Sequence, residues 1–213
     1  MTDRPSFMTD ALAAEIAGSR GATERLFATL AWIDDSVATQ PSLLPGWSVG
    51  HVLTHLARNA DSFVRVLEAA AEGSEARQYP GGVAGRNLDI EEGAKRPAAE
   101  IVDDVRASAA RLDAAWTQAP PVAWQGEGLR NDGSPLLCRM LPMSRWREVE
   151  VHHVDLVLGY SVSDWPAEFV NADLPLALDQ LPGMVDDASQ RATLLAWVYG
   201  RASEPLGIVL RPF

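Results

Sequence analysis

One segment of the sequence, Met143 to Leu158, limits how the chain can fold, because polar residues recur within an apolar helical pattern. A rotation of about 100° per residue places Arg145, Glu148, His152 and Asp155 on one stripe. Apolar residues border that stripe on both sides: Val149 and Leu156 on one, and Val151, Val154 and Leu158 on the other. The pattern predicts a helix that carries polar groups into the interior of a helical bundle.

Two Glu/His pairs on this helix are candidate metal ligands. Glu148 and His152 are four residues apart, so their side chains lie one turn apart on the same face. A carboxylate and a neutral imidazole in this relation can hold one divalent metal ion. Glu150 and His153 form a rival pair with the spacing of di-iron carboxylate bundles, although no other helix supplies a second such pair. Together with Trp146, this rival pair falls on the opposite face, which we expect to meet solvent.

A second predicted helix, Val49 to Ala71, follows the N-cap residue Ser48 and carries two further histidines. His51 and His55 are one turn apart, and the other two of the four histidines lie on the helix described above. Two facing helices would bring histidines and glutamate together around a metal, with the choice between His51 and His55 left open. Ligation by histidine and glutamate favours zinc, and nickel, cobalt or iron would also fit. Three protein ligands leave an open coordination position, as in catalytic sites.

The remaining sequence predicts a mainly α fold, a four-helix bundle with two long connections. Its other two helices are expected over Ala11–Asp34 and Pro97–Gln118, from their apolar residues at helical spacing. The polar, glycine-rich stretch Glu72–Ala94 is expected to be a long loop. Pro120–Pro142, which contains the turn signal Asn131-Asp-Gly-Ser, is expected to be a loop or a small hairpin.

We expect this bundle to occupy residues 1–160 and a short C-terminal α(+β) region to occupy residues 161–213. Within that region, helices are predicted over Glu168–Met184 and Asp187–Arg201, and a strand over Leu206–Leu210.

The composition excludes several classes of partner. Acidic side chains outnumber basic ones by 29 to 18, giving a formal net charge of −11, and such a field repels nucleic acid. No apolar run approaches the ~20 residues that cross a bilayer, and the N-terminus lacks the pattern of a secretory signal. Cys138 is the only cysteine, so an internal disulfide and a multi-thiolate zinc site are both excluded. These features predict a cytoplasmic protein that acts on a small molecule.

Two segments resemble the mycothiol-dependent maleylpyruvate isomerase family, which belongs to the DinB-like metal-binding bundles. They are Leu44-Pro-Gly-Trp-Ser-Val-Gly-His-Val-Leu-Thr-His-Leu-Ala-Arg-Asn-Ala and Arg145-Trp-Arg-Glu-Val-Glu-Val-His-His-Val-Asp-Leu. The resemblance covers about residues 10–160 and implies a DinB-like fold. It also implies that His55, Glu148 and His152 hold the metal, in preference to His51 and to the pair Glu150/His153. Asp155 would then be an outer-shell group.

The same resemblance extends to a C-terminal Gly-Arg motif. Leu195-Ala-Trp-Val-Tyr-Gly-Arg matches it and makes Arg201 the residue that serves activity, where a guanidinium could bind a substrate carboxylate in bidentate fashion. The alternative is an arginine that only stabilises the end of its helix. The region after Gly159 is shorter than the family's usual second domain, so we expect a truncated form of it.

The family resemblance implies zinc and mycothiol as cofactors, together with a carboxylate-bearing electrophile as substrate. A zinc-activated thiolate would add to the cis double bond of maleylpyruvate, the new single bond would rotate, and loss of the thiolate would give trans fumarylpyruvate. One alternative is a thiol S-transferase, which would conjugate an electrophile without eliminating the thiol. Another is a metal-binding or interaction module without turnover, which a fourth protein ligand such as His51 would favour.

Overall fold

The computed structural model describes residues 10–201 and divides the chain into two compact units, Met1–Trp165 and Pro166–Phe213. The described part is mainly helical, with one small sheet of two strands. Among the described residues, no helix has both the length and the apolar character that a membrane span requires. Each unit is considered by itself below.

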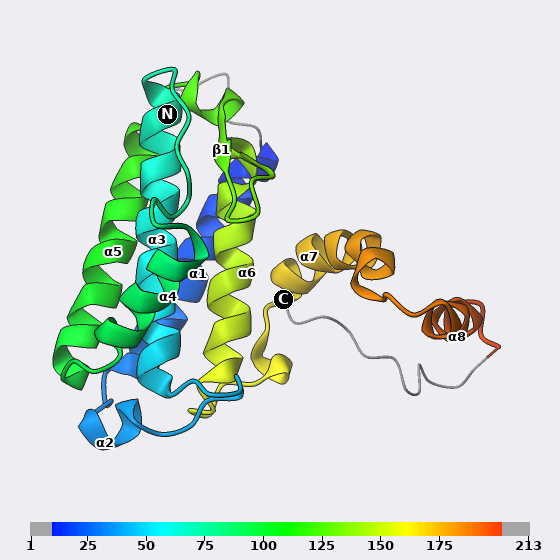
Figure 1. Ribbon diagram of the computed structural model, residues 1–213, viewed down its shortest axis with the longest axis horizontal. Helices are drawn as coiled ribbons and strands as arrows, with labels where there is room; N and C mark the ends of the chain where they lie inside the picture. The colour runs from blue at the N-terminus through cyan, green and yellow to red at the C-terminus, as the bar shows by residue number, and fades with distance from the viewer. Residues whose placement is uncertain (1–9, 202–213) are drawn as a thin grey trace. The chain divides into compact units, whose positions relative to one another are not determined.

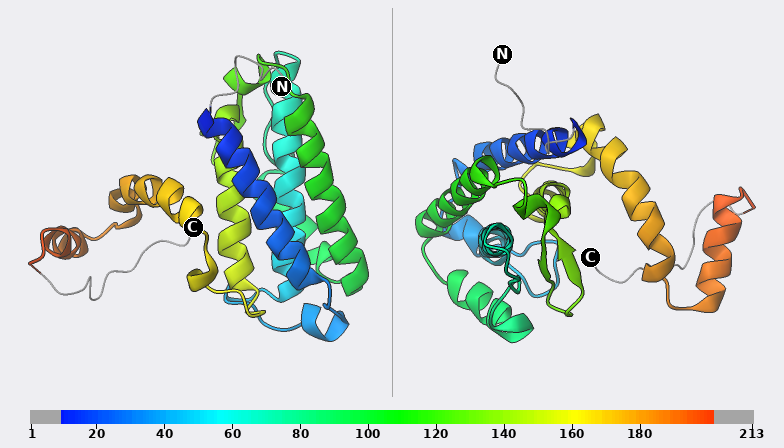
Figure 2. Two further views of the ribbon diagram at one scale, coloured as in Figure 1. Left: turned by 180° about the vertical axis from the view of Figure 1, so that it is seen from behind. Right: turned by 90° about the horizontal axis from the view of Figure 1, so that it is seen from above.

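The first unit is a four-helix bundle made of α1 (Asp10–Leu30), α3 (Val49–Ala71), α5 (Ala98–Gln118) and α6 (Leu141–Asp155). The helices are seen along their length in Figure 1, and the right-hand view of Figure 2 shows α3 and α6 nearly end-on. The strongest pairings are α3 with α5 and α1 with α6. The helices within each pair run parallel, and the two pairs run in opposite directions. The predicted mainly α fold and four-helix bundle are confirmed.

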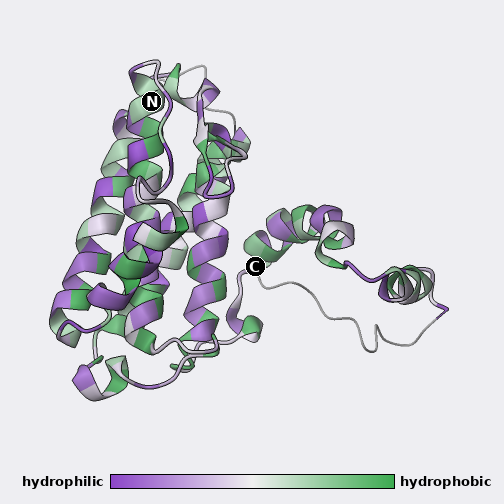
Figure 3. Ribbon diagram, in the orientation of Figure 1, coloured by the Kyte–Doolittle hydropathy of each residue, from purple (hydrophilic) through white to green (hydrophobic). Residues whose placement is uncertain are grey.

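Helix α3 forms the centre of the bundle, and its bounds agree with the prediction. Its first turn is closed by a capping box, in which Ser48 Oγ accepts from the backbone N–H of His51 and the His51 ring accepts from the backbone N–H of Ser48. Most of its side chains are buried, including Leu53, Leu56 and Phe63. The alternation of apolar and polar segments along the bundle helices is visible in Figure 3.

The first helix ends earlier than predicted. Instead of continuing to Asp34, α1 ends at Leu30, and a short helix, α2 (Asp35–Ala38), follows. Asp34 is the N-cap of α2, where its carboxylate accepts from the backbone N–H of Val37. A side chain that caps a new helix cannot also continue the previous one, because an N-cap residue has an extended backbone.

The predicted loop over residues 72–94 is wrong for its second half, which forms α4 (Gly82–Gly93). Four glycines at positions 81, 82, 85 and 93 conceal this helix in the sequence, because glycine lowers helix propensity. Packing against α3 compensates: Ile90 is almost fully buried, and a Cβ on Gly93 would clash with the Thr54 side chain. Tertiary contact therefore decides the structure of this segment.

A β-hairpin connects α5 to α6. Strands β1 (Glu127–Leu129) and β2 (Pro135–Leu137) pair antiparallel, with Gly128 opposite Leu136. Their turn contains Gly133 at a φ of +83°, a conformation that glycine adopts readily. Of the two expectations for residues 120–142, the hairpin is therefore the one observed.

The second unit contains α7 (Ala167–Gln180) and α8 (Ala188–Val198), separated by a 3-10 turn at Leu181–Met184. Asp187 caps α8 by accepting from the backbone N–H groups of Ser189 and Gln190. Helix α8 ends three residues before the predicted Arg201. The predicted strand Leu206–Leu210 lies outside the described residues.

Candidate metal centre

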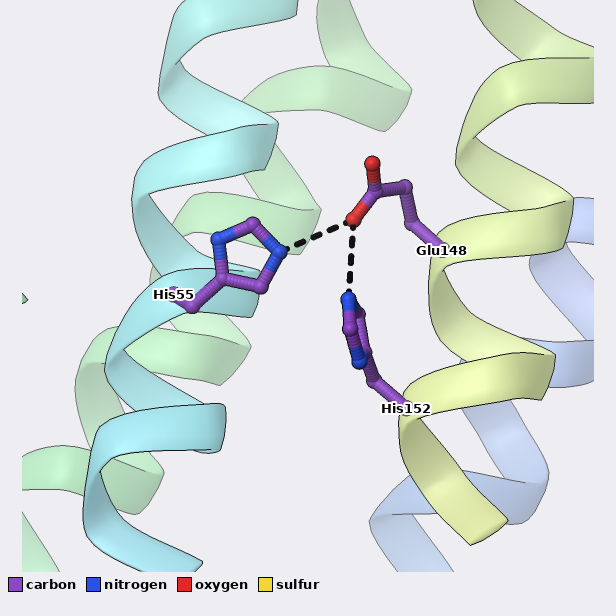
Figure 4. Close-up of side chains that lie close together, drawn as sticks. All are labelled: His55, Glu148 and His152. Atoms are coloured by element: carbon purple, nitrogen blue, oxygen red, sulfur yellow. Dashed lines mark hydrogen bonds and ion pairs between the residues drawn. The ribbon is translucent and has the colours of Figure 1, made fainter. Parts of the chain in front are cut away.

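Three side chains from two facing helices converge on one point in the bundle. His55 comes from α3, and Glu148 and His152 come from α6. His55 Nε2 lies 2.9 Å from Glu148 Oε2, and His152 Nε2 lies 3.4 Å from the same oxygen (Figure 4). One ligand atom from each residue lies within 4.8 Å of the other two. These are the three residues that the family resemblance selects.

The local sequence explains why these groups meet. Helices α3 and α6 run antiparallel, and Arg145, one turn before Glu148, donates from Nη1 to Leu56 O and Asn59 Oδ1 on α3. His55 and His152 are both buried, while the side chain of Glu148 is 20% exposed. The stripe predicted from the sequence is therefore an interior feature, with Arg145 almost completely buried.

The second ring nitrogen of each histidine is also held. His152 Nδ1 lies 2.8 Å from Asp155 Oδ2, so its Nε2 is directed towards Glu148. Arg86, on α4, places Nη2 3.0 Å from His55 Nδ1. A guanidinium can only donate, so His55 Nδ1 accepts and His55 Nε2 carries the proton that it donates to Glu148.

The pKa values of the three groups follow from burial and from these contacts. Burial would raise the pKa of Glu148, but hydrogen bonds from His152 and His55, together with the positive charge of His152, hold it well below its usual range. Burial would lower the pKa of His152, but hydrogen bonds to Asp155 and Glu148 raise it to about 9. Burial lowers the pKa of His55. The cluster therefore holds an ionised carboxylate between two imidazoles.

The donor set suits a divalent metal ion. Two imidazole nitrogens and a carboxylate oxygen are ligands that zinc accepts, and they leave room for an exogenous ligand. The contact between His152 and Asp155 is the outer hydrogen bond that commonly fixes a ligating histidine. A metal on His55 Nε2 would displace the proton now shared with Glu148.

The other two histidines have different partners. His51 Nδ1 lies 2.8 Å from Ser48 Oγ, and its Nε2 lies 3.4 Å from Glu91 Oε2. His51 thus closes the first turn of α3 and is not part of the three-residue cluster.

The expectation that Trp146, Glu150 and His153 meet solvent is wrong. All three are buried, because α1 covers this face of α6. Glu150 forms an ion pair with Arg25 and accepts from Trp146 Nε1 and from Tyr160 Oη. A carboxylate with this many donors at a helix–helix contact serves the fold, and spacing within one helix could not reveal it.

His153 belongs to the same buried face. Its Nε2 lies 2.8 Å from Thr29 Oγ1, and its ring stacks on Tyr160 with 3.9 Å between the centroids. Burial lowers the pKa of His153 to about 4.

Arg201 follows α8 in the second unit. Its backbone N–H donates to Ala196 O, and its side chain is exposed. Its role in binding a substrate carboxylate stays a prediction.

Sequence reasoning missed Arg86, which contacts His55 directly. The signal was weak, because the glycines around it indicated a loop and a lone arginine in a polar stretch does not indicate a site. Its guanidinium also lies 5.7 Å from the Trp47 ring centroid and 5.8 Å from that of Tyr79. These contacts depend on how α4 packs on α3.

Comparison with known proteins supports the relationship that the two sequence segments indicate. Residues 19–157 match the family described as the mycothiol maleylpyruvate isomerase N-terminal domain. A crystal structure of the mycothiol-dependent maleylpyruvate isomerase is similar, with a TM-score of 0.72 and 27% sequence identity, over 79% of this chain and 70% of that one. A crystal structure of a histidine-to-alanine mutant of that enzyme matches equally well. No curated protein sequence matches. The match over residues 19–157 includes all three clustered residues, and by it the chain belongs to the mycothiol maleylpyruvate isomerase N-terminal domain family.

Proposed function

We propose that the chain is a zinc- and mycothiol-dependent enzyme that isomerises maleylpyruvate, or a related electrophile, from cis to trans. The observation that carries the proposal is the convergence of His55, Glu148 and His152 donor atoms within 4.8 Å. The family match and the similar maleylpyruvate isomerase structure support the choice of reaction. A reduced thiol is required, so we place the reaction in the cytoplasm.

His55, Glu148 and His152 would hold the metal in this proposal. When bound, zinc supplies the Lewis acidity that lowers the pKa of a coordinated thiol. Asp155 holds the His152 ring through Nδ1, which leaves Nε2 as the ligand atom. Glu148, between the two imidazoles, keeps its negative charge at neutral pH because its pKa is lowered.

The substrate of this reaction carries two carboxylates, so the protein must also supply positive charge. We propose that Arg201 binds one of them, as the family motif implies, through the paired hydrogen bonds that a guanidinium forms with a carboxylate. The positive charge of Arg201 would also stabilise negative charge that accumulates in the transition state. The residues 161–213 would then act as a shortened second domain.

The test is a thiol-dependent assay on the full chain. Purified protein would be stripped with a chelator, reloaded with zinc, and incubated with mycothiol and maleylpyruvate. We expect fumarylpyruvate to form only with both zinc and mycothiol present. Full turnover by thoroughly metal-free protein would contradict the proposal. Accumulation of a stable thiol conjugate would instead identify an S-transferase, and no turnover with any electrophile would indicate a binding module.

A further inference from the structure

Arg86 is a cation without a carboxylate partner beside the candidate metal centre. Its guanidinium is partly buried between the rings of Trp47 and Tyr79, and its Nη2 lies 3.0 Å from His55 Nδ1. Arg86 also donates from Nη1 to Asn87 Oδ1 over 3.1 Å, and the Tyr79 hydroxyl is a further neutral hydrogen-bond partner. Among residues 10–201, no carboxylate lies within ion-pair distance of it. A neutral imidazole and an amide leave most of the charge of this guanidinium uncompensated.

Arg86 also lines a cavity of about 220 Å³ next to the Tyr79–Gly81 segment. The other two arginines of the cavity wall are engaged: Arg58 pairs with Asp61 and Asp104, and Arg65 donates to Gln78 O. Asp61 and Asp89 also line the cavity, so an anion would be repelled except near Arg86. The arrangement favours a small anionic group at this arginine.

The contact between Arg86 and His55 is compatible with only one tautomer of His55. Nδ1 accepts from Arg86, so Nε2 holds the proton and points at Glu148. Ligation of a metal through Nε2 requires that proton to leave, and a neutral ring then carries its proton on Nδ1. Nδ1 would no longer accept, so the Arg86 donor would be available to another acceptor if Nε2 held a metal.

We propose that Arg86 binds a carboxylate of the substrate beside the metal centre. The inference rests on the proposed function, which supplies a dicarboxylate electrophile, and adds a second arginine to Arg201. Arg86 Cζ lies over the Trp47 and Tyr79 rings, and these cation–π contacts hold the guanidinium beside the centre. Its N–H donors can then meet the two oxygens of a carboxylate. The ligand class that fits this arginine is therefore a small molecule that carries a carboxylate.

The experiment measures binding, with maleate as the probe, by calorimetry on zinc-loaded full chain. The variants are Arg86→Gln, which removes the charge, and Arg86→Lys, which keeps it without the paired donors. Arg106→Gln is the matched control, since Arg106 lies over the Phe27 ring and lines a different cavity. Zinc content and zinc affinity are measured for each protein, because the imidazole contact predicts that Arg86→Gln binds zinc at least as tightly as wild type.

We expect Arg86→Gln to weaken maleate binding about 10- to 100-fold, the range for loss of a charged hydrogen bond. Arg86→Lys should fall between it and wild type, and Arg106→Gln should stay within about twofold, as expected for a remote surface charge. Equal maleate affinity in Arg86→Gln and wild type would overturn the proposal, as would wild type that does not bind maleate. Loss of zinc from both Arg86 variants would overturn it too, because the arginine would then hold the centre together.

These outcomes separate the inference from the proposed function. Arg86-dependent maleate binding without thiol-dependent turnover would support the inference and contradict the isomerase assignment. Thiol-dependent turnover with maleate binding that ignores Arg86 would contradict the inference alone.

Discussion

Asp155 accepts a hydrogen bond from His152 across one helical turn, with 2.8 Å between Nδ1 and Oδ2. This contact fixes the ring so that Nε2 lies next to the Glu148 carboxylate, 3.4 Å away. The carboxylate of Asp155 thus sets the geometry of the centre without being one of the three clustered groups.

We expect Asp155→Ala to lower zinc affinity about 10- to 100-fold, because a ligating histidine loses the partner that orients it. The measurement is zinc affinity by competition with a coloured chelator. Asp103→Ala removes an exposed carboxylate from α5 and should leave zinc affinity unchanged. Equal affinity in Asp155→Ala and wild type would show that His152 needs no such support.

Single alanine substitutions of His55, Glu148 and His152 should each abolish stoichiometric zinc binding, because two remaining ligands form a weak site. His51→Ala is the matched control on α3. It removes a capping contact of typically ~1 kcal/mol in stability but none of the clustered groups. Metal analysis of the purified proteins decides the matter, and retained zinc in all three variants would remove the basis for the centre.

Zinc affinity should depend on pH through His152, whose pKa rises from 6.5 to about 9. Because the pKa is raised in the folded protein, protonation of His152 stabilises the metal-free fold. This contribution is complete below the ordinary pKa of 6.5 and is lost as the pH rises through about 9. Zinc must displace this proton, so its affinity should increase from neutral pH towards pH 9, with about one proton released on binding near neutrality. Calorimetry in buffers of different ionisation enthalpy measures that release. The His152→Ala variant should lose the pH-dependent stability, and a flat profile in wild type would contradict the prediction.

Gly18→Ala should destabilise the protein by about 1–3 kcal/mol through overpacking. A Cβ at this position would lie 2.5 Å from ring atoms of Trp146 at the contact of α1 with α6. Gly21→Ala, three residues along, is the matched control: its Cβ meets only Arg25 Nη1 at 3.4 Å, so better helix propensity should stabilise it by up to about 1 kcal/mol. Thermal unfolding of both variants measures the difference, and equal shifts of the same sign would contradict the packing argument.

Glu150→Gln should cost about 1–3 kcal/mol, because it breaks the ion pair between this buried carboxylate and the partly exposed Arg25 and weakens the hydrogen bond from Tyr160. Zinc content should not change, since Glu150 is not in the cluster. Glu24→Gln, at an exposed position of α1, supplies the control in urea unfolding. Loss of zinc from Glu150→Gln would instead support Glu150 and His153 as the ligand pair.

The sequence was informative where one helix decides the outcome. Helical periodicity and the Ser48 cap predict the bounds of α3, and the stripe on α6 predicts that Arg145 and His152 face inwards. Spacing could not choose between His51 and His55, because both satisfy the same one-turn relation. The structure distinguishes them, because the His51 ring is hydrogen-bonded to Ser48 in the N-terminal cap of α3.

Features that depend on contacts between helices were not predicted. The burial of Glu150 requires α1 to cover the far face of α6, and the periodicity of α6 contains no information about that neighbour. Arg86 reaches His55 because α4 packs on α3 despite its glycines. In both cases tertiary packing overrides a local signal.

The parallel pairing of α1 with α6 also sets an order of assembly. The ion pair from Arg25 to Glu150 joins residues 125 positions apart, whereas Arg58 and Asp104, on α3 and α5, are 46 positions apart. Closing the longer loop costs more entropy, so we expect α3 and α5 to associate before α1 meets α6. In a chain emerging from the ribosome, α1 is made first and its principal partner last. The apolar side of α1 therefore lacks its α6 partner until nearly the whole bundle has been synthesised.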